Sequence, residues 1–305
     1  MTNVYHSILP MRGLLWVNGT DGPALLQGLI TNDVNRLSDE CSIYAALLSP
    51  QGKYLHDFFV MNHPDGEGIL LDCEAKRLPD LLQRLTKYRL RARVNFEDIS
   101  NNFIVAALYG ERALTRLSLK AQEGFTKSFG TSSGKGLIYV DPRLATMGAR
   151  AVLPNVLPSK ALEAKGFSET SPSTYDGWRL AYGLPDGSRD ILIEKSLPLE
   201  CGFHELHGID YDKGCYIGQE ITARTHYRAK IRKRLVPVVI EGPLPPQGTK
   251  ILNDSNNSVG LLCSGKESRA LALLQVDQLH KNRSHDRLRA GDAQLTVDLP
   301  NWLHL

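Results

Sequence analysis

The chain has little of what marks a secreted, membrane-spanning or nucleic-acid-binding protein. Its five cysteines are odd in number and scattered, which does not fit a disulfide framework and favours a reducing compartment. No apolar run approaches the length of a membrane span, and residues 1–6 lack the basic and apolar regions of a leader. The net charge of +3 is too small to imply a nucleic-acid partner. We therefore expect a soluble cytoplasmic protein, or a mitochondrial matrix protein if the source is eukaryotic and the chain is processed.

The composition is that of an ordinary globular protein, with 42% hydrophobic and 23% charged residues in a chain of 305. Short strands alternate with helices up to about residue 230, which predicts an α+β region over residues 1–230. The predicted strands are 14–17, 44–48, 54–61, 103–109 and 136–140, and the predicted helices are 23–30, 75–87, one within 154–166, and 219–228. Beyond residue 230, short strands separated by turn-rich segments predict a small antiparallel β-barrel or sandwich over residues 231–305.

The nine residues Asp212–Glu220 are the most informative segment, because they combine a thiol, an amine, two glycines, an amide and two carboxylates. Cys215 lies just before the helix predicted over 219–228. The helix start and the ammonium group of Lys213 would both favour a thiolate at Cys215, which is a nucleophile and a metal ligand. The alternative is that Cys215 is a small buried side chain in a tight turn.

Residues 208–228, with the run Lys213-Gly-Cys-Tyr-Ile-Gly-Gln-Glu220 and the pair Ala223-Arg224, resemble the signature of the YgfZ family, which are folate-binding relatives of the glycine cleavage T-protein. The run Ile231–Leu235 is most similar to the mitochondrial-type branch, whose members act in iron-sulfur cluster assembly. Residues 28–34, 52–57 and 178–185 resemble further segments of the folate-binding region. The resemblance implies a T-protein-like, multi-lobed α+β fold with a C-terminal β-barrel.

The chain also departs from the T-protein, which places two carboxylates after its glycine-rich turn. Here these places hold His56 and Asp57, and a second segment, whose glutamate holds the pterin in the T-protein, reads Asp141–Leu144 and Gly148–Arg150. Aminomethyl transfer needs a carboxylate that stabilises developing positive charge, and an imidazole does not supply one. We therefore expect folate binding without T-protein catalysis. A structural histidine is the alternative for His56.

The resemblance implies a tetrahydrofolate site, for which the candidates come from four parts of the chain. They are Asn32, Asp33, His56, Trp178, Arg179, Tyr182, Gln219, Glu220 and Arg224. For the two aromatic residues, core packing is the alternative. The basic run from Arg224 to Arg234 would receive the glutamate tail of folate or lie solvated at the surface. It contains few aromatic residues, which weighs against direct nucleic-acid binding.

Two other motifs are weaker. Cys201, His204 and His207 have ligand-like spacing and with Cys215 would make a Cys2His2 metal site, but the chain has no Cys-x-x-Cys pair there, which favours a loop of incidental polar residues. Gly130–Gly136 resembles a phosphate loop superficially, but it is one residue short and has glycine where the magnesium ligand should be. We expect a hairpin loop at this segment.

The function implied by the resemblance is that of an accessory factor in iron-sulfur cluster assembly, supporting client enzymes with four-iron clusters. In this hypothesis Cys215 ligates iron or a bridging iron-sulfur cluster, or acts as a redox thiol. Because one thiolate cannot hold a cluster alone, the hypothesis requires a partner, which we expect to be an A-type scaffold protein. Two alternatives remain open at this point. They are a tetrahydrofolate-dependent aminomethyltransferase and a binding module that regulates tRNA modification.

Overall fold

The computed structural model describes residues 3–228, 230–281 and 287–304. These residues form two compact units. Unit 1 comprises residues 3–50, 55–175 and 206–219, and unit 2 comprises residues 51–54, 176–205 and the described residues from 220 onward. Within the described residues, no helix is both long enough and apolar enough to cross a membrane.

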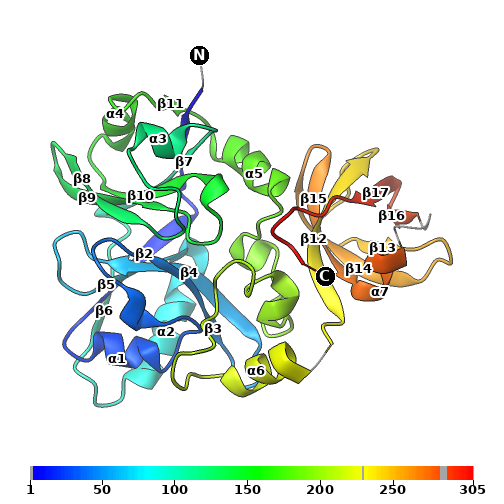
Figure 1. The fold of residues 1–305 in the computed structure, drawn as a ribbon, viewed down its shortest axis with the longest axis horizontal. Coiled ribbons are helices and arrows are strands. Elements are labelled where there is room, and N and C mark those ends of the chain that lie inside the picture. The colour runs from blue at the N-terminus through cyan, green and yellow to red at the C-terminus, as the bar shows by residue number, and fades with distance from the viewer. Residues whose placement is uncertain (1–2, 229, 282–286, 305) are drawn as a thin grey trace. The chain divides into compact units, whose positions relative to one another are not determined.

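Unit 1 contains a five-stranded sheet with the strand order β3-β4-β5-β2-β6. Its strands are β2 (Arg12–Asn18), β3 (Ile43–Leu48), β4 (Tyr54–Asn62), β5 (Ile69–Glu74) and β6 (Asn95–Asp98). The helix α2 (Leu78–Arg89) lies against this sheet (Figure 1) and buries Leu78, Leu81 and Leu85 in its hydrophobic core. The strands β3, β4 and β5 are buried along nearly their whole length, so they are mostly apolar rather than alternating, apart from buried His56 and Asp57 on β4 and Asp72 on β5.

A six-stranded sheet with the order β11-β1-β7-β10-β9-β8 completes unit 1. Its strands are β1 (Tyr5–Ile8), β7 (Phe103–Tyr109), β8 (Thr126–Thr131), β9 (Gly134–Val140), β10 (Ala149–Pro154) and β11 (Ser168–Glu169). The strands β8 and β9 form a hairpin in which Gly130 pairs with Lys135, which confirms the loop expected at this segment. Gly134 has φ +139, a conformation that favours glycine.

The two sheets of unit 1 meet at a buried ionic network. Asp72 on β5 pairs with Arg12 on β2 at 2.6 Å and with Arg150 on β10 at 2.7 Å, and the hydroxyl of Tyr139 on β9 donates to it at 3.2 Å. Burial alone would raise the pKa of Asp72, but the two guanidinium groups outweigh it and lower that pKa. The Arg150 guanidinium carbon lies 4.2 Å from the centroid of the Phe59 ring.

Unit 2 contains a closed β-barrel with the order β12-β15-β14-β13-β16-β17, drawn in yellow to red in Figure 1. Its strands are β12 (Lys233–Glu241), β13 (Lys250–Leu252), β14 (Ser258–Lys266), β15 (Arg269–Gln275), β16 (Leu288–Ala290) and β17 (Ala293–Val297). Closure leaves the barrel without an exposed edge strand. The C-terminal barrel of the predicted fold class is therefore confirmed.

The remaining elements are helices that lie between the strands along the chain. The α-helices are α1 (Gly22–Gln27), α3 (Ala113–Arg116), α4 (Pro158–Glu163), α5 (Pro172–Ala181), α6 (Gln219–Arg228) and α7 (Val276–Lys281). The 3-10 helices are η1 (Val34–Arg36), η2 (Ala75–Arg77), η3 (Ala145–Met147), η4 (Gly187–Arg189) and η5 (Pro198–Cys201). The bounds of α6 are those predicted from the sequence.

Candidate functional site

Cys215 is the exposed thiol of this chain. Of the other four cysteines, Cys73, Cys201 and Cys263 are buried, and Cys41 is half-buried. Cys215 lies in the loop that runs through residues 210–218 of unit 1 and leads into α6. Cys215 is therefore not the small buried side chain of the alternative interpretation. The contacts that hold the loop determine where its thiol is presented.

The loop begins at a turn organised by Asp210. The backbone N–H of Asp210 donates to the carbonyl of Thr31 at 3.0 Å, and the hydroxyl of Thr31 donates to the carbonyl of Gly208 at 2.6 Å. The Asp210 carboxylate accepts the backbone N–H groups of Asp212 at 2.9 Å and Lys213 at 3.1 Å. An aspartate that accepts from residues two and three positions onward stabilises a turn, so the chain direction is set just before the thiol.

Lys213 fastens the loop to the segment that follows α1. Its ammonium group donates to the carbonyls of Gln27 at 2.9 Å, Ile30 at 2.6 Å and Asn32 at 2.8 Å. An ammonium group has three donors, so these carbonyls use all of them. Burial lowers the pKa of Lys213 to about 8, and Asp33 and Asp210 oppose that shift. These bonds hold the ammonium group at the segment that follows α1, and the activating role expected for Lys213 beside Cys215 stays a prediction.

The far end of the loop is fixed as well. Ile217 packs against the hydrophobic core of the five-stranded sheet, and the side-chain oxygen of Gln219 accepts the backbone N–H of Tyr216 at 3.0 Å. Gly218 has φ +83, the left-handed conformation that favours glycine. Between the two fixed ends, a Cβ added at Gly214 would meet no atom within 4 Å. Gly214 and Cys215 therefore form an exposed apex on a fixed base.

Asn32 and Asp33, both expected at the folate site, belong to this base. The Asn32 amide donates to the carbonyls of Tyr44 and His207, each at 2.7 Å, and its oxygen accepts the N–H of Asp33 at 2.8 Å. The Asp33 carboxylate caps η1 through the N–H of Asn35 at 3.0 Å. These groups hold their own chain in place, so the structure gives both residues a supporting role.

His56 and its neighbour Asp57 point to opposite sides of the sheet, as adjacent residues of a strand do. Nε2 of His56 lies 2.8 Å from the carboxylate of Asp80 on α2. Asp57 instead accepts the hydroxyl of Tyr44 at 2.9 Å. Burial, assisted by the charge of Arg77, lowers the pKa of His56 to about 4. The geometry favours the structural alternative for His56 rather than a ligand contact.

Lowering the pH should show how buried His56 affects the stability of the fold. The folded protein binds a proton on His56 only near pH 4, whereas the ordinary value is 6.5, so the unfolded chain binds more protons between these limits. The free energy of unfolding should therefore fall by about 3 kcal/mol from this group as the pH drops from 7 to 4. Urea denaturation of His56→Gln across that range should show a shallower loss. His304 is exposed, so the control His304→Gln should show the same pH dependence of the free energy of unfolding as the wild type. If His56→Gln also keeps that pH dependence, His56 is not the group that causes it.

The predicted folate residues of α5 and the following turn are held within unit 2. Arg179 is buried and donates to Asp190 at 2.8 Å, to Asp176 at 2.6 Å and to the hydroxyl of Ser264 at 2.6 Å. The rings of Trp178 and Tyr182 lie 5.3 Å apart. The Arg179 donors therefore connect parts of unit 2. Trp178 and Tyr182 are half-buried, and their place in a folate site stays a prediction.

Glu220 and Arg224 lie on the exposed face of α6. With Ala223, Tyr227 and Arg228 they line a shallow hollow of about 370 Å³. Of the basic run, the following residues are exposed: Arg224, Arg228, Lys230, Arg232 and Lys233. Arg234 is buried and donates to the carboxylate of Glu205 and the carbonyl of Leu199. The exposed part of the run thus remains available to an anionic ligand or partner.

Two of the four residues of the alternative Cys2His2 site, Cys201 and His204, have other surroundings within unit 2. Cys201 is buried, and burial raises the pKa of its thiol. The His204 ring packs against the His226 ring with centroids 4.8 Å apart. Among the described residues, the one group of three histidine, cysteine or acidic side chains with closely placed ligand atoms is elsewhere, and it contains none of the four expected ligands.

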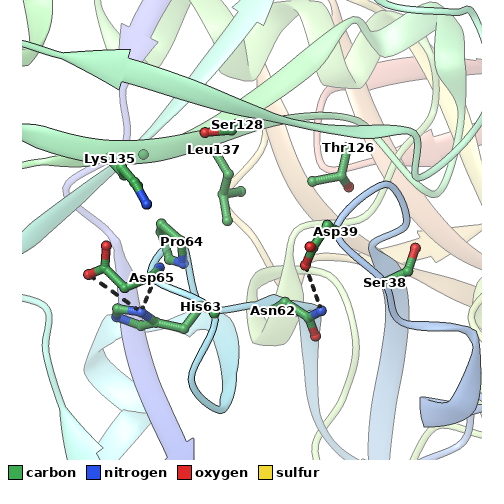
Figure 2. A pocket seen from close by; sticks show the side chains of 12 residues that line it. Ser38, Asp39, Asn62, His63, Pro64, Asp65, Thr126, Ser128, Lys135 and Leu137 are labelled. Atoms are coloured by element: carbon green, nitrogen blue, oxygen red, sulfur yellow. Dashed lines mark hydrogen bonds and ion pairs between the residues drawn. The ribbon is translucent and has the colours of Figure 1, made fainter.

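Two pockets of unit 1 lie near polar residues. One, of about 200 Å³, borders the base of the Cys215 loop and is lined in part by Asn32, Arg36 and His207. The other, of about 360 Å³, is lined by polar residues that include Asp39, Asn62 and Lys135, with Lys135 reaching toward the turn at Asp65 (Figure 2). No residue predicted for folate or the thiol site lines this second pocket, and nothing in the sequence pattern distinguished it.

Comparisons with known proteins show which proteins the chain is similar to. Residues 232–305 match the family described as the CAF17 C-terminal β-barrel domain. A Neosartorya fischeri protein named iron-sulfur cluster assembly factor IBA57 homolog, mitochondrial, is 32% identical, over 96% of this chain and 69% of its own length. The human iron-sulfur cluster assembly factor IBA57, mitochondrial, is 32% identical over 95% of this chain and 83% of its own.

Among solved structures, the glycine cleavage system aminomethyltransferase T from Bartonella henselae matches with a TM-score of 0.78 at 15% identity. The match covers 99% of this chain and 87% of that one. At this identity it bears on the fold alone. The T-protein-like fold implied by the resemblance is confirmed.

Proposed function

Because this chain belongs to the family of the iron-sulfur cluster assembly factor IBA57, we propose that it acts in iron-sulfur cluster assembly and supports the maturation of enzymes with four-iron clusters. The observation that carries the proposal is the exposed thiol of Cys215 at the apex of a loop fixed at both ends. A buried thiol would serve packing. A thiol presented at the surface on a fixed base is suited to reach a ligand position in a second molecule.

The number of thiolates that an iron-sulfur cluster needs implies a partner protein. Protein-bound iron-sulfur clusters are held by several thiolates, and Cys215 supplies one. No other thiol of the chain is exposed. We propose that an A-type scaffold protein supplies the remaining thiolates and that the cluster, as cargo, is shared across the contact. The exposed basic residues of α6 and the following segment would favour an acidic surface on that scaffold.

Tetrahydrofolate binding is supported by the fold class and not by the residues expected to hold the ligand. The polar groups of Asn32, Asp33, His56 and Arg179 are bonded within their own units, so they do not fit a folate site as they stand. Exposed Arg224 retains donors that suit the glutamate tail. We therefore assign no step of cluster assembly to folate. Its binding remains a prediction that a titration with tetrahydrofolate would measure.

The cellular compartment is also inferred from the named relatives. The named relatives are described as mitochondrial. This supports a mitochondrial location for the chain over the cytoplasmic one, and we propose it on that ground.

Aconitase activity in cells that lack this protein tests the function. The wild type should restore activity, and Cys215→Ser should restore little or none, because a hydroxyl does not replace a thiolate ligand. Cys41→Ser is the matched control, since Cys41 is half-buried and should be dispensable. If aconitase activity stays normal without the protein, cluster assembly is the wrong function and one-carbon transfer becomes the better candidate. If Cys215→Ser rescues fully, the thiol is not the cluster ligand.

A further inference from the structure

His6 is a buried histidine whose ring nitrogens lack hydrogen bonds. It lies on β1, it has 0% exposure, and neither Nδ1 nor Nε2 has a hydrogen-bond partner among the described residues. Val4 and Ile8, two positions away on either side, share its face of the strand and belong to or pack on the hydrophobic core of the six-stranded sheet. A buried polar group without a partner costs stability, so this histidine calls for an explanation other than packing.

Two carboxylates approach the His6 ring from different elements. Glu169 is the partner of His6 in the parallel pairing of β1 with β11, so both side chains project from the same face of the sheet. Glu163 is the last residue of α4. The ligand atoms of all three side chains lie within 4.8 Å of one another. Both glutamates are exposed, so one side of the group opens to solvent.

The backbone around this group is fixed. The backbone N–H of Thr170 donates to the carbonyl of His6 at 2.8 Å, and its hydroxyl donates to the same oxygen at 3.0 Å. The N–H of Gly166 donates to the carbonyl of Glu163 at 2.7 Å and closes the turn after α4. The three Cα positions are therefore set by β1, β11 and the end of α4, and only the two exposed glutamate side chains have room to adjust.

We propose that His6, Glu163 and Glu169 bind a divalent transition-metal ion, with water completing the coordination. One imidazole nitrogen with two carboxylate oxygens is a donor set typical of Zn²⁺ and Mn²⁺, whereas Mg²⁺ and Ca²⁺ prefer oxygen alone. Tetrahedral Zn²⁺ places its ligands about 3.4 Å apart, a distance that small rotations of the exposed glutamates would reach. The bound ion would join α4 and the edge strand β11 to β1. This site is separate from the thiol of Cys215.

The protonation state of His6 suits this role. Burial lowers its pKa, although the charges of Glu169 and Glu163 oppose the shift. A neutral imidazole offers a lone pair to a metal ion without first losing a proton.

Zinc titration of the full chain tests the site. Cys215→Ser serves as the parent, because it removes the exposed thiol as a competing ligand, and a chromophoric chelator reports free Zn²⁺. The parent should bind one Zn²⁺ ion tightly, and adding Glu163→Gln and Glu169→Gln should weaken binding by at least about tenfold. Adding Glu241→Gln, an exposed glutamate of the barrel, should leave binding unchanged. If the parent binds no Zn²⁺, or if the double glutamine variant binds it equally well, the proposal is wrong.

A second variant separates coordination from folding. His6→Leu fills the apolar surroundings without an unpaired polar group, so without metal it should melt at the same or a higher temperature than the parent. Added Zn²⁺ should raise the melting temperature of the parent and leave that of His6→Leu unchanged. An equal rise in both proteins would show that His6 is not a ligand. A His6→Leu protein that melts lower without metal would show that the ring has a structural role instead.

Discussion

Replacing Asp72 by alanine should lower the free energy of unfolding by about 3–5 kcal/mol, because it removes the one carboxylate shared by two buried guanidinium groups. Asp72 has 0% exposure, and its oxygens lie 2.6 Å from Arg12 and 2.7 Å from Arg150. Without it, both cations stay buried in unit 1 and lose their main counter-charge. The expected loss is a large share of the stability of a typical protein, so the variant should unfold at a much lower urea concentration.

The matched control for Asp72→Ala is Asp65→Ala. Asp65 also lies near a basic side chain, His63, at 3.9 Å, but its side chain is 66% exposed. Exposed ion pairs contribute about 0–1 kcal/mol, so the control should unfold close to the wild type. If the two variants lose similar amounts of stability, the network between the sheets of unit 1 is no stronger than a surface pair, and Asp72 does not have the stabilising role that its burial and its two cations predict.

Asp72 shows why such a network cannot be predicted from the sequence. It appears as a single aspartate in the apolar run Ile69–Glu74, and its partners Arg12 and Arg150 are 60 and 78 residues away. Local pattern predicted the strands next to β5 and β10 in the two sheets, because apolar runs are local properties, but it did not predict β5 and β10 themselves. Which strands become neighbours is decided by the packing of the two sheets. Side-chain partners across sheets follow only from that packing.

His56 and Lys213 show the same limit at the candidate site. The residue pattern predicted the strand that carries His56, but the choice between its face and that of Asp57 depends on which side α2 covers. Lys213 is two residues from Cys215 in sequence, which suggested an activated thiol. Its ammonium group instead bonds to carbonyls 181 to 186 residues away in the chain. The motif was sufficient to predict the family. The contacts that hold its residues in place could be determined only from the fold.

Lys213→Met should therefore detach the Cys215 loop without removing its thiol. Three carbonyls, those of Gln27, Ile30 and Asn32, lose their common donor, and the free energy of unfolding should fall by about 3 kcal/mol. Amide hydrogens of residues 210–219 should exchange faster, since the loop loses its fixed base. Cluster sharing with an A-type scaffold should fall by at least about tenfold, because a mobile thiol is no longer held in the position for transfer.

The rate of thiol alkylation distinguishes a loop-holding Lys213 from the thiolate-stabilising Lys213 that the motif suggested. If Lys213 serves only to hold the loop, iodoacetamide should modify Cys215 in Lys213→Met at least as fast as in the wild type. If Lys213 instead stabilises the thiolate, alkylation should slow, because the thiolate is the reacting form. Lys127→Met, which removes an exposed charge from β8, is the control and should change neither alkylation nor cluster sharing. Slower alkylation with an unchanged exchange rate in the loop would restore the activating role of Lys213, whereas unchanged alkylation with lost cluster sharing would show that the position of Cys215 is what the partner requires.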